Sequence, residues 1–245
     1  MIDFFAKELP NDPGMKLFNP MHIAISIVFV ILLILIVVFR KKLRKFGHYT
    51  VIRRTAAAIL FANMFIHYAA RIILGIWSLE EDLPLHICFV TNFFMMYILF
   101  TDNKHKLYRV VYFFTLIGPL PAIVWPDLHR GPSGWVFYQF IISHHFLILV
   151  SAYCLLVLGY ETGIKSAVAA FFVGNGYVGA IAVMNSIIGT NYVMLTSLPD
   201  QLYEIYPFLN AMPAFFWLEL VGILVVMTAY VPAFFARRER NNSKS

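Results

Sequence analysis

The segment Leu83–Asn92 holds a histidine and a cysteine two positions apart, His86 and Cys88, inside an otherwise apolar stretch. A thiolate is a strong nucleophile, and a nearby imidazole can generate it by accepting the thiol proton. Two adjacent imidazoles follow later in the chain, at His144 and His145. Cysteine and histidine in this combination predict acyl transfer through a thioester.

The same residues also fit a second chemistry. His86, Cys88 and one of His144 or His145 would make a three-ligand zinc site, as a zinc-dependent membrane hydrolase would need. The chain contains no HExxH motif, so a zincin-type site has no support. We therefore rank metal binding behind thiol chemistry and expect neither a metal nor another cofactor.

The composition defines the environment of these residues. Hydrophobic residues make up 60% of the chain and charged residues 13%, about half the charged fraction of a soluble domain. Apolar runs of about 20 residues recur along the whole chain, the length that a helix needs to cross a bilayer. The net charge of +6 falls in short blocks between these runs, which argues against a nucleic-acid partner. The pattern predicts an all-α polytopic membrane protein.

Seven apolar runs predict seven transmembrane helices in a single transmembrane domain that covers residues 1–245. The expected spans are 21–39, 55–79, 84–101, 107–125, 135–159, 163–189 and 211–236. Pro84 is expected to open the third helix and Pro213 the seventh, because proline is tolerated in a first turn. Pro119 and Pro121 are expected to kink the fourth helix.

Basic residues predict the orientation, because cytoplasmic loops carry an excess of Lys and Arg. With the N-terminus outside and the C-terminus inside, the inner segments hold fifteen basic residues and the outer segments three. The inner set is Arg40, Lys41, Lys42, Arg44, Lys45, Arg53, Arg54, Lys104, Lys106, Arg109, Lys165, Arg237, Arg238, Arg240 and Lys244, and the outer set is Lys7, Lys16 and Arg130.

This orientation places most of the polar residues of the spans in the outer half of the membrane, at a rise of 1.5 Å per residue. They are Arg71, Cys88, His144, His145, Asn185 and Glu219, with His86 just above the outer boundary. Such a one-sided cluster predicts a cavity open to the outer leaflet. Two structural alternatives remain open: an Arg71–Glu219 ion pair, and Asn185 as a hydrogen-bonding contact between helices.

A cysteine facing this cavity could attack a phospholipid ester and hold the acyl chain as a thioester. Arg71 could bind the lipid phosphate, and either Asn185 or backbone N–H groups near Pro84 could stabilise the oxyanion. Two other classes of function remain open. One is a transporter or receptor for a small amphiphile, with Arg71 and Glu219 as ligand-binding groups, and the other is a scaffold folded around structural polar pairs.

Four motifs occur in a fixed order: LPLHIC (83–88), SHH (143–145), VMN (183–185) and GTNYVML (189–195). As a set they resemble the YwaF-like family of small polytopic membrane proteins. Eukaryotic relatives of that family include an acyltransferase that remodels ether phospholipids through a cysteine thioester and a histidine. The resemblance therefore implies membrane acyl transfer.

The resemblance also implies roles for individual residues. The nucleophile would be Cys88, and the base would be His144 by its context, with His145 open because the histidine is doubled. Asn185, Asn191 and Tyr192 match the later motif and are expected to contribute to the substrate site. Many family members carry a polar residue after the cysteine, where this chain has Phe89, so its activity or substrate could differ.

Together these observations predict a multi-pass acyltransferase of a bacterial plasma membrane that acts on phospholipid at the outer leaflet. Cys88 is expected to carry the acyl chain, and His86 to orient the site. Substrate contacts are expected from His86, Arg71, Asn185, Asn191, Tyr192 and Glu219. The acceptor stays open between a lysophospholipid, a lipoprotein amine and water, and the sequence does not indicate an oligomeric state.

Overall fold

The structure is a computed structural model that describes residues 1–101 and 105–242; Lys104 and Lys244, two of the predicted inner charges, lie outside these ranges. The described part is all-helical, without a β-strand. Its elements are α1 (Ile2–Phe5), α2 (Pro20–Phe46), α3 (Tyr49–Ile73), α4 (Ile87–Thr101), α5 (His105–Ile117), α6 (Pro119–Val124), α7 (Trp135–Ile141), the π-helical turn η1 (Ile142–Phe146), α8 (Leu147–Leu156), α9 (Ile164–Ile188), η2 (Tyr192–Met194), α10 (Asp200–Ile205), η3 (Pro207–Ala211) and α11 (Ala214–Asn242).

Six helical stretches of the described chain are long and apolar enough to cross a membrane. They are Pro20–Phe46, Tyr49–Ile73, Lys106–Val124, Trp135–Leu156, Ile164–Ile188 and Ala214–Asn242. The third expected span, 84–101, forms the shorter apolar helix α4 of 15 residues. The all-helical membrane class is confirmed, and the number of full-length spans is six rather than the seven expected.

Two boundaries differ from the prediction around the second and third spans. The second helix ends at Ile73 rather than at residue 79, because Gly75 takes a left-handed φ of 67° and the Ile76 N–H bonds back to the Arg71 carbonyl. The next helix begins at Ile87, three residues after Pro84. The residues between the two helices form an irregular loop at one end of the bundle, and Arg71 therefore lies close to that end.

The expected kink after the fourth apolar run is present. α5 ends at Ile117, and α6 begins at Pro119 after the single residue Gly118. The prolines of α6 cannot donate the backbone bonds that would continue α5. The break turns the chain just where it passes the beginning of α4.

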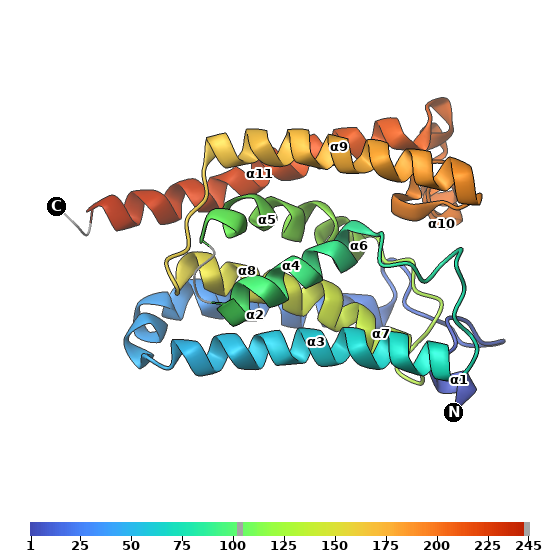
Figure 1. The fold of residues 1–245 in the computed structure, drawn as a ribbon, viewed down its shortest axis with the longest axis horizontal. Helices are drawn as coiled ribbons and strands as arrows, with labels where there is room; N and C mark the ends of the chain where they lie inside the picture. The colour runs from blue at the N-terminus through green and yellow to red at the C-terminus, as the bar shows by residue number, and fades with distance from the viewer. Residues whose placement is uncertain (102–104, 243–245) are drawn as a thin grey trace.

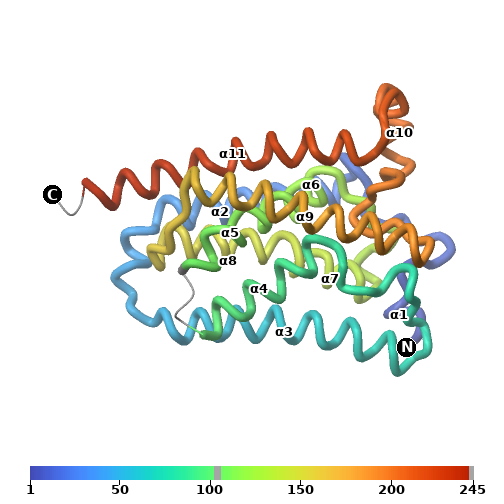
Figure 2. The backbone as a smooth tube through the Cα atoms, turned by 45° about the horizontal axis from the view of Figure 1, so that its top comes forward, coloured from blue at the N-terminus to red at the C-terminus, as the bar shows by residue number. Residues whose placement is uncertain are grey.

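The helices run roughly parallel to one long axis, with the N- and C-termini at opposite ends (Figure 1). α3 packs against α4, α4 against α5, and α5 against both α9 and α11. The continuous stretch α7–η1–α8 is mostly buried and passes through the middle of the bundle, as Figure 2 shows from a second angle. The functional residues predicted on α4 and η1 thus lie on central elements.

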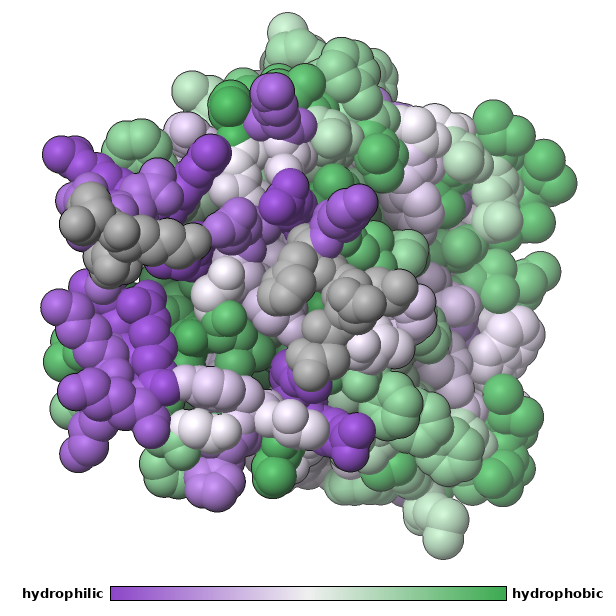
Figure 3. Space-filling view, turned by 60° about the vertical axis from the view of Figure 1, so that its left-hand side comes forward, coloured by the Kyte–Doolittle hydropathy of each residue, from purple (hydrophilic) through white to green (hydrophobic). Residues whose placement is uncertain are grey.

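The outer surface of the bundle is apolar along α2, α9 and α11, whose side chains are mostly exposed. Exposed apolar faces of this extent match a lipid environment. Hydrophilic side chains gather at the end that carries the α2–α3 turn and the C-terminal part of α11 (Figure 3). The other end is covered by the N-terminal segment, where the buried Arg130 pairs with Asp12 at 2.9 Å.

Candidate active site

Cys88 is the second residue of α4 and carries a half-buried free thiol. Its position depends on close packing against the break between α5 and α6. A Cβ added to Gly118 would lie 2.9 Å from the Ile87 side chain and 3.1 Å from the Cys88 backbone nitrogen. Gly118 has an ordinary helical φ, so the space beside α4, and not backbone strain, is what requires a glycine.

Replacing Gly118 with Ala is expected to push the first turn of α4 away and to lower the free energy of unfolding by about 1–3 kcal/mol, as overpacking usually does. Thermal unfolding of the purified protein measures this effect. Gly176→Ala in α9 is the matched control, since nothing lies within 4 Å of its added Cβ. Equal unfolding temperatures for the two variants would contradict the packing role of Gly118.

A single amide joins the cysteine to the histidine-bearing turn. The Asn92 Nδ2 group donates to the Cys88 carbonyl at 2.8 Å and to the Ser143 carbonyl at 3.3 Å. The Ser143 hydroxyl in turn accepts from Asn63 of α3 and Gln139 of α7, both at 2.9 Å. These buried bonds hold the start of α4 and the residue before His144 next to each other.

His144 is buried in the π-helical turn η1, a type of helical irregularity that is frequent at functional sites. Its Nδ1 lies 2.8 Å from the Phe140 carbonyl oxygen. A carbonyl oxygen only accepts, so Nδ1 carries the proton and the Nε2 of the neutral ring has a free lone pair. This is the tautomer that a general base needs.

His145 occupies a different environment. Its ring lies edge-on to Phe29, with 5.2 Å between the ring centroids, and also contacts Phe140. Both ring nitrogens are buried, and neither makes a hydrogen bond within the described residues. Of the two candidate bases, only His144 has a contact that fixes its tautomer.

His86 lies directly before α4, where its Nδ1 accepts from the Val193 N–H at 3.4 Å and its ring contacts Tyr192. It also interacts electrostatically with His144. His86 lines a polar cavity of about 390 Å³ at the end of the bundle that carries the α3–α4 loop. The cavity is lined by Lys7, Glu8, Glu80, Glu81, His86, Asp127, Leu128, His129, Val136, Asn191 and Tyr192. Of the three residues, His86 alone lines this cavity; Cys88 and His144 lie on the two segments that Asn92 joins.

Two tyrosines are close enough to Cys88 to interact with it electrostatically, Tyr68 of α3 and Tyr177 of α9. The Tyr177 hydroxyl donates to the Leu85 carbonyl at 2.5 Å. The Tyr68 hydroxyl is buried and has no hydrogen-bond partner within the described residues. The ring of Tyr68 also contacts Phe89, with centroids 6.0 Å apart. Tyr68 therefore presents an unused O–H donor beside the cysteine.

Arg71 pairs with Asp82, and the predicted ion pair with Glu219 is wrong. The guanidinium lies 2.8 Å from the Asp82 carboxylate and also donates to the carbonyls of Ile76 and Phe5. The early end of α3 places Arg71 beside the loop that carries Asp82, away from Glu219 on α11. Glu219 instead lies 3.5 Å from the amide of Asn175.

The Asp82 carboxyl lies in a loop outside the apolar helices. Burial acts to raise its pKa, but hydrogen bonds from Arg71 and the Ser78 N–H, with the charge of Lys7, bring the pKa below its usual value. A carboxyl with a lowered folded-state pKa stabilises the fold above its unfolded pKa of about 3.9, and this stabilisation is lost as the pH falls through the folded value. The Arg71–Asp82 pair is therefore fully formed at neutral pH.

Replacing Asp82 with Asn is expected to lower the free energy of unfolding by about 3–5 kcal/mol at neutral pH, because it leaves the buried Arg71 charge uncompensated. The difference from wild type should hold from about pH 7 to about pH 5 and shrink below about pH 4. Glu81→Gln is the control, since that exposed carboxylate pairs with Lys7 at the surface and should contribute less than about 1 kcal/mol. Thermal unfolding across pH would contradict this prediction if both variants behaved alike.

The residues of the later motif connect the loop between α3 and α4 to the loop that follows α9. Asn185 bonds through both amide atoms to the backbone of Tyr192, and its oxygen also accepts from Thr190. The Tyr192 hydroxyl donates to Leu79 and accepts from Leu83. Asn191 bonds to Thr196 and Ser197 within its own loop. In this structure the side chains of Asn185 and Asn191 are thus occupied by contacts within the protein.

The zinc alternative has no geometric support in the described ranges. Within residues 1–101 and 105–242, no group of three or more His, Cys, Asp or Glu side chains is placed to hold a metal ion. His86, Cys88 and His144 lie near one another, but they do not form a ligand set.

The family model described as the TMEM164 family matches residues 17–230, which include all four motifs. The chain belongs to the TMEM164 family. The YwaF-like name that the motifs suggested is not confirmed.

One distant relative matches most of the chain. An uncharacterized protein of Treponema pallidum (strain Nichols) is 24% identical over 223 residues, which cover 88% of each chain. No solved structure gave a significant match. Family membership and six apolar helices establish a multi-pass membrane protein of the TMEM164 family.

Proposed function

We propose that this protein is a membrane acyltransferase that moves a fatty acyl chain from a phospholipid to an acceptor through a thioester on Cys88. The observation that carries the proposal is a free thiol at the start of α4 and, on the adjoining turn η1, a histidine, His144, whose Nε2 is available as a base. The hydrogen bonds of Asn92 hold these two segments together. The resemblance of the four motifs to an acyltransferase-containing family supports the same reaction.

The reaction would proceed in two halves. His144 Nε2 takes the thiol proton, the Cys88 sulfur forms a bond to the ester carbonyl carbon, and the ester C–O bond breaks. The departing lysophospholipid alcohol takes the proton from His144. In the second half, His144 accepts a proton from the acceptor hydroxyl or amine, which attacks the thioester; the C–S bond breaks, and the released thiolate takes the proton back from His144. The acceptor would be a lysophospholipid, a lipoprotein amine or water.

Tyr68 is the best-placed donor for the oxyanion that forms during both halves. Asn185 was the first candidate, but its amide already bonds to the loop around Tyr192. The Tyr68 O–H is buried without a partner near Cys88, so it can donate to substrate without breaking a bond of the resting protein. A fixed donor in a water-poor site stabilises developing charge strongly.

Replacing Tyr68 with Phe is expected to slow acylation of Cys88 about 10²-fold, the effect of removing one oxyanion donor. The unfolding temperature should not fall, since the lost hydroxyl makes no hydrogen bond in the described structure. Tyr177→Phe is the matched control. It removes a hydroxyl near the same cysteine, but one that bonds to Leu85, so it should lower stability by about 1 kcal/mol and leave acylation nearly unchanged. The reverse ranking of the two variants would assign the donor role to Tyr177.

The proposal includes seven passes with the N-terminus outside, in a bacterial plasma membrane. α4 would be the seventh pass, although its 15 residues span only about 22 Å of a hydrocarbon core about 30 Å thick. The polar cavity lies next to the start of α4 and would admit water there, so α4 need not cross the full hydrocarbon core. Termini at opposite ends of the bundle (Figure 1) agree with an odd number of passes.

The polar cavity gives this site a place for a lipid headgroup. His86, Asn191 and Tyr192 form one side of it, and Lys7 and acidic residues form the rest. Cys88 does not line this cavity, but it follows the lining residue His86 by two positions, so a headgroup bound there would direct the ester of its lipid toward the start of α4. A transporter or receptor is less well supported, because its expected ligand groups, Arg71 and Glu219, contact other protein groups.

The intact mass of the purified full-length protein after incubation with mixed phospholipids tests the proposal. The expected result is a fatty-acyl mass increment that neutral hydroxylamine removes, since hydroxylamine cleaves thioesters. Omitting the acceptor and stopping the reaction with acid at short times would let the acyl-enzyme accumulate before it is consumed. An increment that resists hydroxylamine, or no increment in wild type under these stalled conditions, would reject the thioester and favour a transporter.

A further inference from the structure

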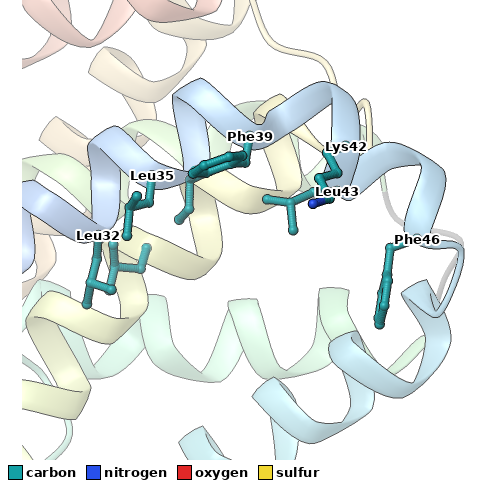
Figure 4. A pocket seen from close by; sticks show the side chains of 8 residues that line it. Leu32, Leu35, Phe39, Lys42, Leu43 and Phe46 are labelled. Carbon is teal, nitrogen blue, oxygen red and sulfur yellow. The ribbon is translucent and has the colours of Figure 1, made fainter.

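A groove lies on the side of the bundle, away from Cys88. It is near the end that carries the α2–α3 turn and the C-terminal part of α11, called the basic end below. It has a volume of about 410 Å³ and is lined by Leu32, Leu35, Ile36, Phe39, Lys42, Leu43, Phe46 and Leu149. Figure 4 shows side chains of α2 entering the opening, with α8 behind it. Every lining residue is apolar except Lys42.

The groove arises because α2 and α3 diverge after a short turn. Only Gly47 and His48 separate the two helices, yet α2 packs mainly against α8 while α3 packs mainly against α4. One face of α2 is therefore left uncovered between them. Leu32, Leu35, Phe39, Lys42 and Phe46 follow one another at intervals of three and four residues, which places them in a single stripe on the helix.

The length of this stripe fits one leaflet. Lys42 lies ten residues beyond Leu32, a distance of about 15 Å along the helix. Half of a hydrocarbon core about 30 Å thick is the same length. An acyl chain whose headgroup is level with Lys42 would therefore reach Leu32 near the middle of the bilayer.

The charge of Lys42 is not used within the described protein. Of its basic neighbours, Arg40 pairs with Glu239 at 3.0 Å, and Arg44 donates to the Leu156 carbonyl at 2.7 and 2.9 Å. Lys42 makes no hydrogen bond or ion pair with any residue in the described ranges and lines the groove with its side chain. A cation at the rim of an apolar groove is complementary to an anion with an apolar body.

We propose that this groove is a binding site for an anionic phospholipid of the leaflet at the basic end. Its phosphate contacts Lys42, and one acyl chain lies along the stripe between α2 and α8. Basic pockets between transmembrane helices bind anionic headgroups in this way. The site is separate from Cys88 and does not depend on the proposed acyl transfer; its ligand would hold α2 against α8.

Spin-labelled lipids test this site on the full-length protein in phosphatidylcholine vesicles. Trace phosphatidylglycerol, labelled near the end of one acyl chain, should associate more strongly than phosphatidylcholine with the same label. Lys42→Gln should reduce the association of labelled phosphatidylglycerol about fivefold, the usual contribution of one lysine near an anionic lipid. Leu35→Trp, which fills the groove, should reduce it without changing any charge.

Lys41→Gln is the matched control, because it removes the same charge about 100° away around α2 from a residue that does not line the groove. It should change association less than about twofold. Equal losses for Lys41→Gln and Lys42→Gln would overturn the proposal in favour of general attraction to the basic end. Equal association of the two labelled lipids with wild type, or no effect of Leu35→Trp, would also overturn it.

Discussion

The Cys88→Ser variant is expected to lose acyl transfer more than about 10⁴-fold, because the reaction as proposed cannot form its covalent intermediate without the sulfur. Serine keeps the size of the side chain, and the thiol makes no hydrogen bond that is needed for the position of α4. The variant should therefore unfold at the wild-type temperature. Release of lysophospholipid from a labelled phospholipid, together with the hydroxylamine-sensitive mass increment, measures the loss.

Cys154→Ser is the matched control for this substitution. Cys154 is fully buried on α8 within the main apolar core, on a different element from the candidate site. Placing a hydroxyl there should lower stability by about 1–3 kcal/mol and leave acylation of Cys88 intact. A Cys88→Ser protein that still transferred acyl chains, or a mass increment that moved with Cys154, would reject Cys88 as the nucleophile.

The helices could be predicted from apolar runs alone, but the end of the second helix could not. Apolar residues continue past Ile73 through Ile76 and Trp77, so hydropathy extends the second span to residue 79. The left-handed Gly75 ends the helix instead, and a conformation of this kind leaves no trace in hydropathy. This error placed Arg71 too deep in the membrane. Glu219 was therefore considered as its partner, and Asp82 in the following loop was not.

The sequence indicated the candidate reactive residues of the site, but not the residues that pack against them and hydrogen-bond around them. Cys88, His86 and His144 follow from residue type and from the motif resemblance. Asn92 had a signal that went unused, since it lies four residues after Cys88 on the same face of a helix. The close approach of Gly118 and the free hydroxyl of Tyr68 are properties of three-dimensional packing between distant segments, which no local pattern reports. The hydrogen bonds that occupy the Asn185 amide are likewise visible only in the folded structure.

The π-helical turn is the feature that separates the two histidines. On a regular helix, adjacent residues point about 100° apart, so residue type left both histidines open and only the motif context favoured His144. In η1 the extra residue per turn aims His144 Nδ1 at the Phe140 carbonyl, while His145 packs against Phe29. The choice between them depends on hydrogen bonding that only the structure contains.

The His144→Ala variant is accordingly expected to slow acyl transfer about 10³-fold, within the usual contribution of general acid–base catalysis. His145 serves as the control, because it has a similar burial on the same turn but no hydrogen bond on either nitrogen. His145→Leu should keep transfer within about threefold of wild type. It should also unfold at an equal or higher temperature, since it removes two buried polar atoms without partners.

A second substitution separates catalysis by His144 from support of the turn. His144→Gln can keep a donor near the Phe140 carbonyl through its amide, but it has no basic nitrogen. It should therefore regain stability lost in His144→Ala without regaining activity. Transfer restored by glutamine would mean that His144 only positions η1. A loss of transfer in His145→Leu with His144→Ala unaffected would make His145 the base, and the tautomer argument from Phe140 would then be wrong.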